Sequence, residues 1–280
     1  MKTQIVGLIF ITCLLSGLCI LFGCRKTTPE PPPPGDSTKV ADLKRGLLLY
    51  LPFNGSIADS SGNNNSTQLI GGAALTNDEH GYANSAFGDD GSGGRLIVTN
   101  NGSIKFDTAF SVSMSFMERD NSPRTMLLSM VNTATGKGVT FGFGNSAPAT
   151  REVVFGVLSN LASCDDAAVG TNTDNDTAHN FIPQPDSWYN IVCTYNHGVQ
   201  EIYINGVLTG RQSGPYTSTR ICPDAKVVIG GWWDSDAISI NGKIDNVRLY
   251  NRVLLPQEIT MLAQHFQPTT NSIRQTIGGN

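Results

Sequence analysis

Short runs in which apolar and polar residues alternate recur along most of this chain, separated by clusters of Gly, Asn, Asp and Ser. In the run at 110–117, Phe110, Val112, Met114 and Phe116 fall on one side and the serines on the other. Successive side chains of a β-strand point to opposite faces, so this spacing predicts a strand with one buried face. Similar runs occupy residues 46–53, 95–100, 125–131, 138–144, 152–158, 188–196, 200–206, 225–231 and 242–251.

Turn and helix signals indicate how these runs are connected. Asn205-Gly206 predicts a two-residue hairpin, because a type I′ turn needs positive φ at both central residues. The segment 195–198 predicts a second hairpin just before it. Residues 255–264 have apolar residues at helical spacing, with Pro256 suited to the first turn. Together these signals predict an all-β chain, folded as a two-sheet antiparallel β-sandwich with one short C-terminal helix.

Composition and charge narrow the class of partner. Charged residues make up only 15% of the chain, which is typical of a turn-rich β protein with a weakly charged surface. The formal net charge is −4, and basic residues are adjacent only at 25–26 and 44–45. Nucleic acid is therefore not expected as a partner, because phosphate binding needs a basic face.

Residues 1–24 are predicted to be a targeting segment, with a positive start and an apolar run over 5–22. Gly23 directly before Cys24 resembles a bacterial lipoprotein cleavage site, at which Cys24 becomes the lipidated first residue. Phe22 departs from the smaller residue usual there, so an uncleaved membrane anchor is the alternative. Both alternatives predict an anchored protein of the bacterial cell envelope, periplasmic or on the cell surface.

Composition also divides the rest of the chain into segments. Residues 25–45 are predicted to form a proline-rich tether, because the proline run within them favours extended polyproline II structure. The predicted folded domain covers residues 46–265, and residues 266–280 form a flexible tail. Within the domain, residues 159–185 are expected to form one long loop.

Three cysteines lie within the predicted domain. Cys193 falls inside a strand pattern, where a free thiol behaves as a small hydrophobic side chain. Cys164 and Cys222 both fall in polar, loop-like sequence. Because an oxidising compartment permits one disulfide among three cysteines, we predict a Cys164–Cys222 bond and a buried Cys193.

Three sequence blocks resemble, in order, a known family. LYLPFNGSIADSSGNNNST is similar to the opening strand and loop of laminin-G-like domains. WYNIVCTYN with QEIYINGVL resembles their central hairpin, and GKIDNVRLYNRVLLPQEI resembles their closing strand and terminal helix. The blocks cover residues 46–265 and resemble the pentraxin-like branch of the concanavalin A-like lectin/glucanase superfamily. The resemblance implies a jelly-roll topology for the predicted sandwich.

The resemblance also implies a structural calcium ion where the first loop meets the last strand. The matching side chains are Asn54 and Asp245, and Asp59 and the backbone carbonyls near Gly62 and Asn63 are further candidates. Their oxygen atoms are hard ligands of the kind that Ca²⁺ prefers. Position 54 is more often aspartate in the family, so Asn54 removes one negative charge. The alternative is that Asp59 caps a turn and Asp245 hydrogen-bonds loop backbone without a metal.

Alternation along 243–250 assigns these residues to two faces of a strand. We expect one face to carry Ile244, Asn246, Arg248 and Tyr250. We expect the other face to carry Lys243, Asp245, Val247 and Leu249. A partly buried carboxylate beside two apolar residues would need hydrogen-bonding partners.

Hydrolysis of polysaccharides in this superfamily uses two carboxylates that face one cleft. Two such residues on one strand must lie two or four positions apart. No two glutamates after residue 24 are that close, and the Glu-x-Asp-x-x-Glu pattern of the family's hydrolases is missing. We therefore expect no enzymatic activity. The paired aspartates at 165–166 and 234/236 leave an aspartate-based hydrolase as an alternative.

The stretch GGWWDSD, residues 230–236, is the strongest ligand-binding hypothesis in the sequence. Neighbours in extended backbone point to opposite sides, so one indole can face solvent and stack on a sugar while polar groups bind hydroxyls. The candidate ligand-binding residues are Trp232, Trp233, Asp234, Asp236 and Asn241. The alternative is that both indoles pack beneath the loop.

These features predict a non-catalytic carbohydrate-binding module of a cell-envelope lipoprotein, with a glycan or glycoprotein as its partner. The main alternative is a protein-binding or adhesion module, which would bury both tryptophans and expose an apolar patch elsewhere. A hydrolase would instead place two carboxylates about 5–10 Å apart in a groove. The third tryptophan, Trp188, opens a central strand and is predicted to lie in the core.

Overall fold

The computed structural model describes residues 40–120, 125–131, 138–144, 152–157, 174–178, 181–214, 217–219, 225–232 and 238–264. The first strands are β1 (Leu47–Leu51), β2 (Ser66–Ile70), β3 (Ala74–Thr76), β4 (Ala86–Asp90) and β5 (Arg95–Thr99). They are followed by β6 (Ala109–Glu118), β7 (Thr125–Val131), β8 (Gly138–Gly144), β9 (Glu152–Val157) and β10 (Asp174–Ala178). The last elements are β11 (Trp188–Asn196), β12 (Val199–Ile204), β13 (Val207–Ser213), β14 (Lys226–Ile229), β15 (Asn241–Tyr250) and the helix α1 (Pro256–Leu262).

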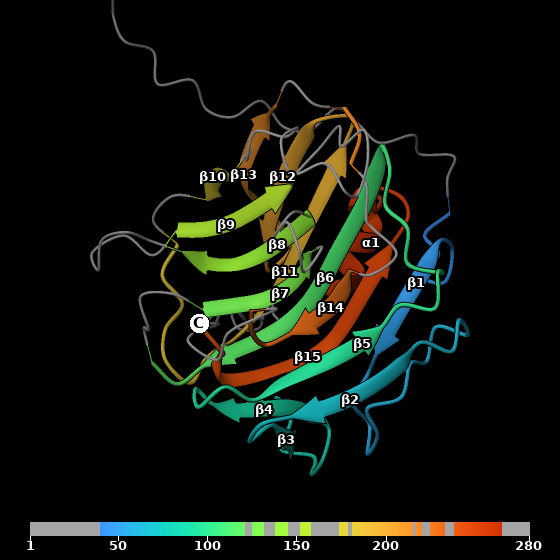
Figure 1. Cartoon of the computed structure of the whole chain (residues 1–280). Helices are drawn as coiled ribbons and strands as arrows, with labels where there is room; N and C mark the ends of the chain where they lie inside the picture. Colours follow the sequence, from blue (N-terminus) through green and yellow to red (C-terminus); the bar gives the residue numbers. More distant parts are fainter. Residues whose placement is uncertain are drawn as a thin grey trace, which may run out of the picture. The chain divides into compact units, whose positions relative to one another are not determined.

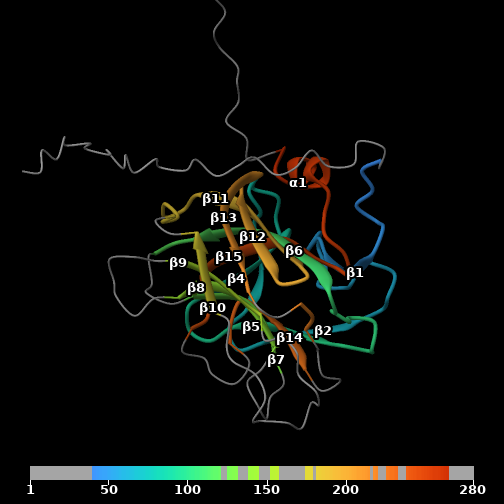
Figure 2. The same cartoon turned by 90° about the horizontal axis from the view of Figure 1, so that it is seen from above.

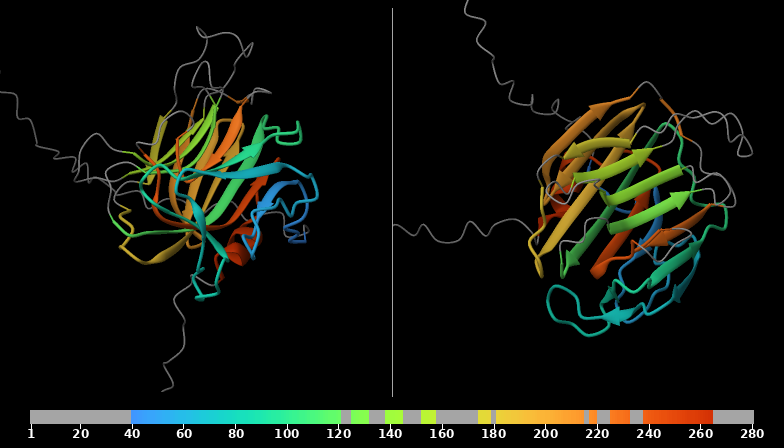
Figure 3. Two further views of the ribbon diagram at one scale, coloured as in Figure 1. Left: turned by 60° about the horizontal axis from the view of Figure 1, so that its bottom comes forward. Right: turned by 60° about the vertical axis from the view of Figure 1, so that its left-hand side comes forward.

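The strands form two antiparallel sheets packed face to face, as the sequence predicts (Figure 1). Sheet A has the order β13-β12-β11-β6-β15-β4-β3, with β1 also paired to β15. Sheet B has the order β10-β9-β8-β7-β14-β5-β2. In the right-hand view of Figure 3, the yellow-green strands of sheet B lie across the gold strands of sheet A. The non-sequential strand orders show that the chain crosses repeatedly between the two sheets.

The core lies between the inner faces of the two sheets. Sheet A contributes Phe116 and Cys193, which are fully buried. Sheet B contributes Phe141 and Phe155, whose rings meet edge-on with centroids 6.5 Å apart. Burial of apolar area, at roughly 25 cal/mol per Å², is the main stabilising contribution of such a core. The predicted burial of Cys193 is confirmed, and this burial raises the pKa of its thiol well above the usual value.

Both predicted hairpins are confirmed by the strand register and the backbone angles. His197 and Gly198 link β11 to β12, with φ of 47° and 88°. Asn205 and Gly206 link β12 to β13, with φ of 48° and 78°. Positive φ at both central positions is the type I′ geometry, whose twist matches that of the paired strands.

Strand β6 is buried on both faces, whereas its alternation predicts burial on one. Its apolar residues point into the core as expected. However, Ser111, Ser113 and Ser115, on the face turned away from sheet B, are only 0%, 0% and 3% exposed. We call this side the outer face of sheet A. Seen from above, α1 lies on this side of the sheet, opposite β5, β7 and β14 (Figure 2).

Strand β15 contains a β-bulge that shifts its alternation by one residue. Asp245 pairs with Ser115, but the next aligned pair is Arg248 with Ser113. Two residues of β15, at 246 and 247, therefore lie opposite the single residue between those serines. Asn246 adopts a left-handed φ of 54°, which Asn tolerates better than most residues.

The bulge makes part of the face assignment for residues 243–250 wrong. Val247 and Leu249 belong to the core, whereas Asp245 lies on the outer face, directly across from Ser115. Ile244 also faces the core, although alternation had grouped it with Arg248. Because of the extra residue, the side chains after Asp245 point to the face opposite to the one that strict alternation predicts. A pattern with a period of two cannot predict such a bulge.

Helix α1 is confirmed, and a charged pair compensates for its unusual start. Leu255 stands where a capping serine would be usual, but the carboxylate of Glu258 accepts the Leu255 backbone N–H at 2.7 Å. The same carboxylate accepts two hydrogen bonds from Arg252, at 2.6 and 2.9 Å, and one from the Asp42 backbone N–H at 2.9 Å. Glu258 thereby joins the helix start to the segment that precedes β1.

Four strands were not predicted, namely β2, β3, β4 and β10. The first three have only three to five residues, and β4 contains Gly and Asp, which are depleted in strands. Strand β10 pairs with β9 inside the segment 159–185, so the expectation of one long loop is wrong at 174–178. Among the residues that the structure describes, no helix is long and apolar enough to cross a membrane.

Candidate functional site

Three buried polar residues form one row across the outer face of sheet A. Asn190 of β11 and Asp245 of β15 each lie directly opposite Ser115 of β6, the strand between them. Their exposed fractions are 2% for Asn190, 3% for Ser115 and 5% for Asp245. Directly opposed residues have Cβ atoms about 4.5–5.5 Å apart, so the row is a continuous polar strip.

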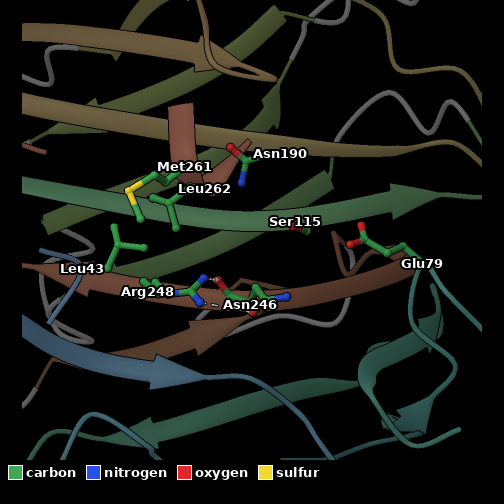
Figure 4. A pocket seen from close by; sticks show the side chains of 8 residues that line it. All are labelled: Leu43, Glu79, Ser115, Asn190, Asn246, Arg248, Met261 and Leu262. Carbon is green, nitrogen blue, oxygen red and sulfur yellow. Dashed lines mark hydrogen bonds between the residues drawn. The ribbon is translucent and has the colours of Figure 1, made fainter. Parts of the chain in front are cut away.

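A pocket with a volume of about 160 Å³ lies against this strip (Figure 4). Its lining residues are Leu43, Glu79, Ser115, Asn190, Asn246, Arg248, Met261 and Leu262. Figure 4 shows the three apolar side chains at one end, Glu79 at the other, and the polar residues between them. The pocket therefore has an apolar end, a polar floor and an acidic end.

Asn190 lies at the floor with its side-chain nitrogen toward the pocket and its oxygen turned away from it (Figure 4). Its side-chain oxygen is buried and has no hydrogen-bond partner. Its side-chain nitrogen reaches the Met114 carbonyl oxygen at 3.4 Å, and its backbone N–H donates to the Asn205 side chain at 2.9 Å. A buried unpaired acceptor costs about 1–3 kcal/mol of stability.

Asp245 supplies a carboxyl group at the edge of this floor. One of its oxygens accepts the Asn246 backbone N–H at 2.6 Å, and the other accepts the Asn246 side-chain amide at 2.9 Å. Burial raises the pKa of Asp245 to about 7. The carboxylates of Glu79 and Asp78 raise it too, against the lowering effects of the Asn246 N–H and of Arg248. Asp245 therefore holds its proton to a higher pH than an exposed aspartate does.

Arg248 is held in one place on the pocket wall. Its guanidinium carbon lies 4.0 Å from the centroid of the Tyr50 ring. It donates to the Asn246 backbone oxygen at 3.2 Å and to the Asn246 side-chain oxygen at 3.4 Å. The Tyr50 hydroxyl donates to that same side-chain oxygen at 3.2 Å. Cation–π stacking and these hydrogen bonds order the long side chain in advance of any ligand.

Trp188 lies on the outer face beside this pocket, so its predicted place in the core is wrong. It stands two residues before Asn190, and the register of β11 with β6 continues from Trp188 without a shift. Ile191 and Cys193 face the core, so Trp188 and Asn190 share the opposite face. The indole is partly exposed. Alternation within NIVCTY could have identified this placement from the sequence.

Only two residues of the site predicted from GGWWDSD, Trp232 and Asn241, are among the described residues. Trp232 is partly buried, and Trp233, Asp234 and Asp236 lie outside the described residues. Asn241 donates its side-chain amide to Asp120 at 2.6 Å and accepts from Arg119 at 3.3 Å. Neither Trp232 nor Asn241 lines the pocket. A sugar site that combines them stays a prediction.

The residues expected to hold calcium have other contacts in the structure. Asn54 is exposed. The Asp59 carboxylate accepts hydrogen bonds from the Tyr50 N–H, from the N–H and hydroxyl of Ser61, and from both nitrogens of Asn65. Burial raises the pKa of Asp59, but these hydrogen bonds outweigh it and hold the pKa below the usual value. Asp59 thus organises its own loop.

This arrangement does not fit a calcium ion shared by Asn54, Asp59 and Asp245. Calcium needs available carboxylate oxygens, whereas those of Asp59 and of Asp245 already accept hydrogen bonds from neighbouring donors. Within the described ranges, no group of three or more His, Cys, Asp or Glu side chains could hold a metal ion. Calcium binding stays a prediction, and we assign the metal no role.

The predicted covalent features also stay predictions. Cys164 and Cys222, expected to form a disulfide, lie outside the described residues, as does Cys24, the expected lipidation site.

Two packed antiparallel sheets, a terminal helix and a pocket on one sheet face define a lectin-like β-sandwich. Residues 90–260 match the family model of the concanavalin A-like lectin/glucanases superfamily. The chain therefore belongs to this superfamily, as the resemblance of its three sequence blocks predicts. No curated protein sequence matches the chain.

Solved structures share this fold at low sequence identity. One is domain 4 of AbnA, a GH43 extracellular arabinanase from Geobacillus stearothermophilus, in complex with arabinotriose. Its TM-score is 0.58 at 18% sequence identity, and the match covers 78% of this chain and 98% of that domain. The receptor binding domain of botulinum neurotoxin mosaic serotype C/D has a TM-score of 0.60 and 16% identity, covering 80% of this chain and 52% of that one.

A third structure is the botulinum neurotoxin serotype D ligand binding domain in complex with N-acetylneuraminic acid. It has a TM-score of 0.57 and 16% identity, covering 79% of this chain and 51% of that one. This chain therefore spans about half the length of the neurotoxin domains. At these identities the likeness shows the fold alone.

Proposed function

We propose that this domain is a non-catalytic carbohydrate-binding module whose glycan binds on the outer face of sheet A. The observation that carries the proposal is the position of the partly exposed Trp188, two residues along β11 from Asn190 at the floor of the pocket. Two residues span about 7 Å of a strand. A sugar ring stacked on the indole would therefore keep its hydroxyl groups within reach of the polar row.

The chemistry of the pocket supports a polyhydroxylated ligand. Asn190, Asn246 and Ser115 offer amide and hydroxyl groups, and Arg248 offers fixed donors. The apolar end suits the C–H face of a sugar ring. Two of the similar structures are described as complexes with sugars, one with arabinotriose and one with N-acetylneuraminic acid. This supports a glycan as the ligand class.

The carboxyl groups favour binding without hydrolysis. Glu79 is the one acidic residue among those that line the pocket. Asp245 lies outside the lining, and both of its oxygens accept hydrogen bonds from Asn246. A glycosidase needs two carboxyl groups that face the same bond.

The proposal includes attachment to the bacterial cell envelope through a lipid on Cys24. It is supported by the Gly23-Cys24 sequence after an apolar run. Mass spectrometry of the mature N-terminus should show cleavage before Cys24 and a diacylglyceryl modification. An intact residue 1–24 segment would contradict lipidation and support the uncleaved anchor.

A glycan array with matched variants tests the binding function. We expect the wild-type protein to bind a defined set of glycans, Trp188→Ala to lose that binding, and Trp188→Phe to keep part of it. Trp232→Ala should bind like the wild type. Thermal unfolding should confirm that each variant is folded.

Two results would contradict the proposal in different ways. If Trp232→Ala loses binding and Trp188→Ala does not, the sugar site lies at GGWWDSD, as first predicted from the sequence. If the wild type binds no glycan at all, the domain is not a carbohydrate-binding module, and a protein partner becomes the better explanation.

A further inference from the structure

Residues 42–45, which we call the strap, close the apolar end of the pocket. They are the last residues of the predicted tether. The Leu43 side chain lines the pocket together with Met261 and Leu262 of α1 (Figure 4). Leu43 also packs, partly buried, against the apolar cluster that contains Ile259 of the same helix. The apolar end of the pocket is therefore built from two parts, one from α1 and one from the strap.

The strap is held by side chains of the closing strand and of the helix region. Its backbone binds three of them, namely Tyr250, Arg252 and Glu258. Arg252 donates to the carbonyl oxygens of Asp42 and Arg45 at 2.8 and 2.7 Å. Glu258 accepts the Asp42 N–H at 2.9 Å, and the Tyr250 hydroxyl donates to the Leu43 carbonyl oxygen at 3.1 Å. These bonds fix the place of Leu43 on the pocket wall.

The strap has little apolar burial of its own. Asp42, Lys44 and Arg45 are exposed, and Leu43 is the one strap residue that is partly buried. Segments with few buried apolar contacts and exposed hydrogen bonds open locally at a low free-energy cost. A molecule that fills the apolar end contacts Leu43 only while the strap is bound to α1. By linkage, such a molecule stabilises the bound strap by the same factor by which the strap raises its affinity.

We infer that Leu43 is a ligand-binding residue and that a bound glycan holds the strap against α1. The C–H face of a sugar ring lies between Leu43 and the two leucine and methionine side chains of the helix. With the pocket empty, the strap opens more often, and its four residues lengthen the tether by up to roughly 14 Å. This inference rests on the proposed function and adds to it a contact residue and a link between occupancy and the anchor.

Amide hydrogen exchange of the full-length protein tests the link, measured by NMR with and without the array glycan that the wild type binds most tightly. The backbone N–H groups of Asp42, Lys44 and Arg45 donate to Glu258 and to Asp42, so their exchange reports on the bound strap. We expect the glycan to slow this exchange about fivefold or more, the range of a typical coupling between sites. The amides of the hairpin at 197–198, which does not line the pocket, should exchange at an unchanged rate.

Variants of the strap test the contact with the ligand. Leu43→Ala should weaken binding to the array glycans about tenfold, because it removes most of one apolar side chain from the pocket wall. Tyr250→Phe keeps the ring but removes the hydroxyl that binds the strap, so it should speed the exchange of the strap amides. Lys44→Ala, at an exposed position of the same strap, should bind like the wild type. Thermal unfolding should confirm that each variant is folded.

The outcomes separate this inference from the proposed function. Wild-type affinity in Leu43→Ala, or strap amides whose exchange does not respond to the glycan, would overturn the inference and leave glycan binding in place. A wild-type protein that binds no glycan on the array would overturn both.

Discussion

Asn190 and Asp245 lie on strands that are not neighbours, yet each directly faces Ser115, so the three form a single row across sheet A. The row exists because β6 is flanked by β11 on one side and β15 on the other. The bulge after Asp245 then turns Val247 into the core while Asp245 stays on the outer face. One inserted residue thus lets the same strand serve both the core and the pocket.

Asp245 should make the protein less stable as pH rises. Its pKa is raised from 3.8 to about 7, so the folded state binds this proton more tightly than the unfolded chain does. The resulting stabilisation is complete below about pH 4 and is lost as pH rises through about 7. Relative to Asp245→Asn, the wild type should lose a few kcal/mol, at most about 4, over this range. Chemical denaturation at several pH values measures the difference.

The exposed Asp107 provides the control for this experiment. Asp107→Asn should leave the pH profile of unfolding unchanged. Parallel profiles for the wild type and Asp245→Asn would contradict the raised pKa of Asp245.

The Arg252–Glu258 pair should be a large contributor to stability. Glu258 is fully buried, and removing one partner of a buried ion pair typically costs about 3–5 kcal/mol. We expect Glu258→Ala to lower the free energy of unfolding by this amount, whereas Gln264→Ala, on the exposed side of the chain end, should change it little. A loss below about 0.5 kcal/mol would contradict the structural role of the pair.

The Glu258 carboxylate should also make the stability of the folded protein depend on pH in the acid range. Burial raises the pKa of Glu258, but hydrogen bonds from Arg252, Leu255 and Asp42 outweigh burial and lower the pKa below 4.5. Its stabilisation is therefore present at neutral pH and is lost as pH falls through the lowered pKa. The wild type should lose its advantage over Glu258→Ala in strong acid, and an advantage that persists there would contradict this assignment.

The bulge residue Asn246 should tolerate glycine better than a β-branched residue. Its φ of 54° suits glycine, whereas valine in this conformation is strained by about 1–3 kcal/mol. Asn246→Gly should lose only the side-chain bonds to Tyr50, Arg248 and Asp245. Asn246→Val should be clearly less stable than Asn246→Gly in thermal unfolding. Equal stability of the two variants would argue against the bulge.

The thiol content tests the cysteine predictions. A thiol reagent should label no cysteine in the folded protein, because Cys193 is buried and its raised pKa disfavours the thiolate. After unfolding, one thiol should react if Cys164 and Cys222 are bonded and Cys24 carries lipid. Three reactive thiols would contradict the disulfide, and labelling before unfolding would contradict the burial of Cys193.

Sequence patterns predicted the two-sheet architecture and most of its strands, because each of those strand signals is local. The strand at 110–117 and the Asn205-Gly206 turn are predicted from neighbouring residues alone, and both elements are confirmed, although both faces of that strand are buried. The site was harder to predict because it depends on which strands meet. Nothing in the sequence places Ser115 between Asn190 and Asp245, or indicates that Asn246 adds a residue to β15.

The placement of Trp188 was predicted wrongly because the prediction relied on residue type. A tryptophan at the start of a central strand was assigned to the core from its size, while the alternation of the next residues already placed it on the outer face. The serines of β6 were expected to face solvent, but α1 and the segment before β1 lie on that side. Whether the outer face of a strand is buried depends on contacts with segments distant in the sequence, and a local pattern does not predict those contacts.

Titration of an isotope-labelled sample with the preferred glycan, followed by NMR, tests the central claim most directly. The account predicts the largest shifts at the Asn190 side-chain amide and the Trp188 indole N–H, with the Trp232 indole N–H unchanged. Shifts centred on Trp232, with the Asn190 and Trp188 signals unmoved, would contradict a binding site on the outer face of sheet A.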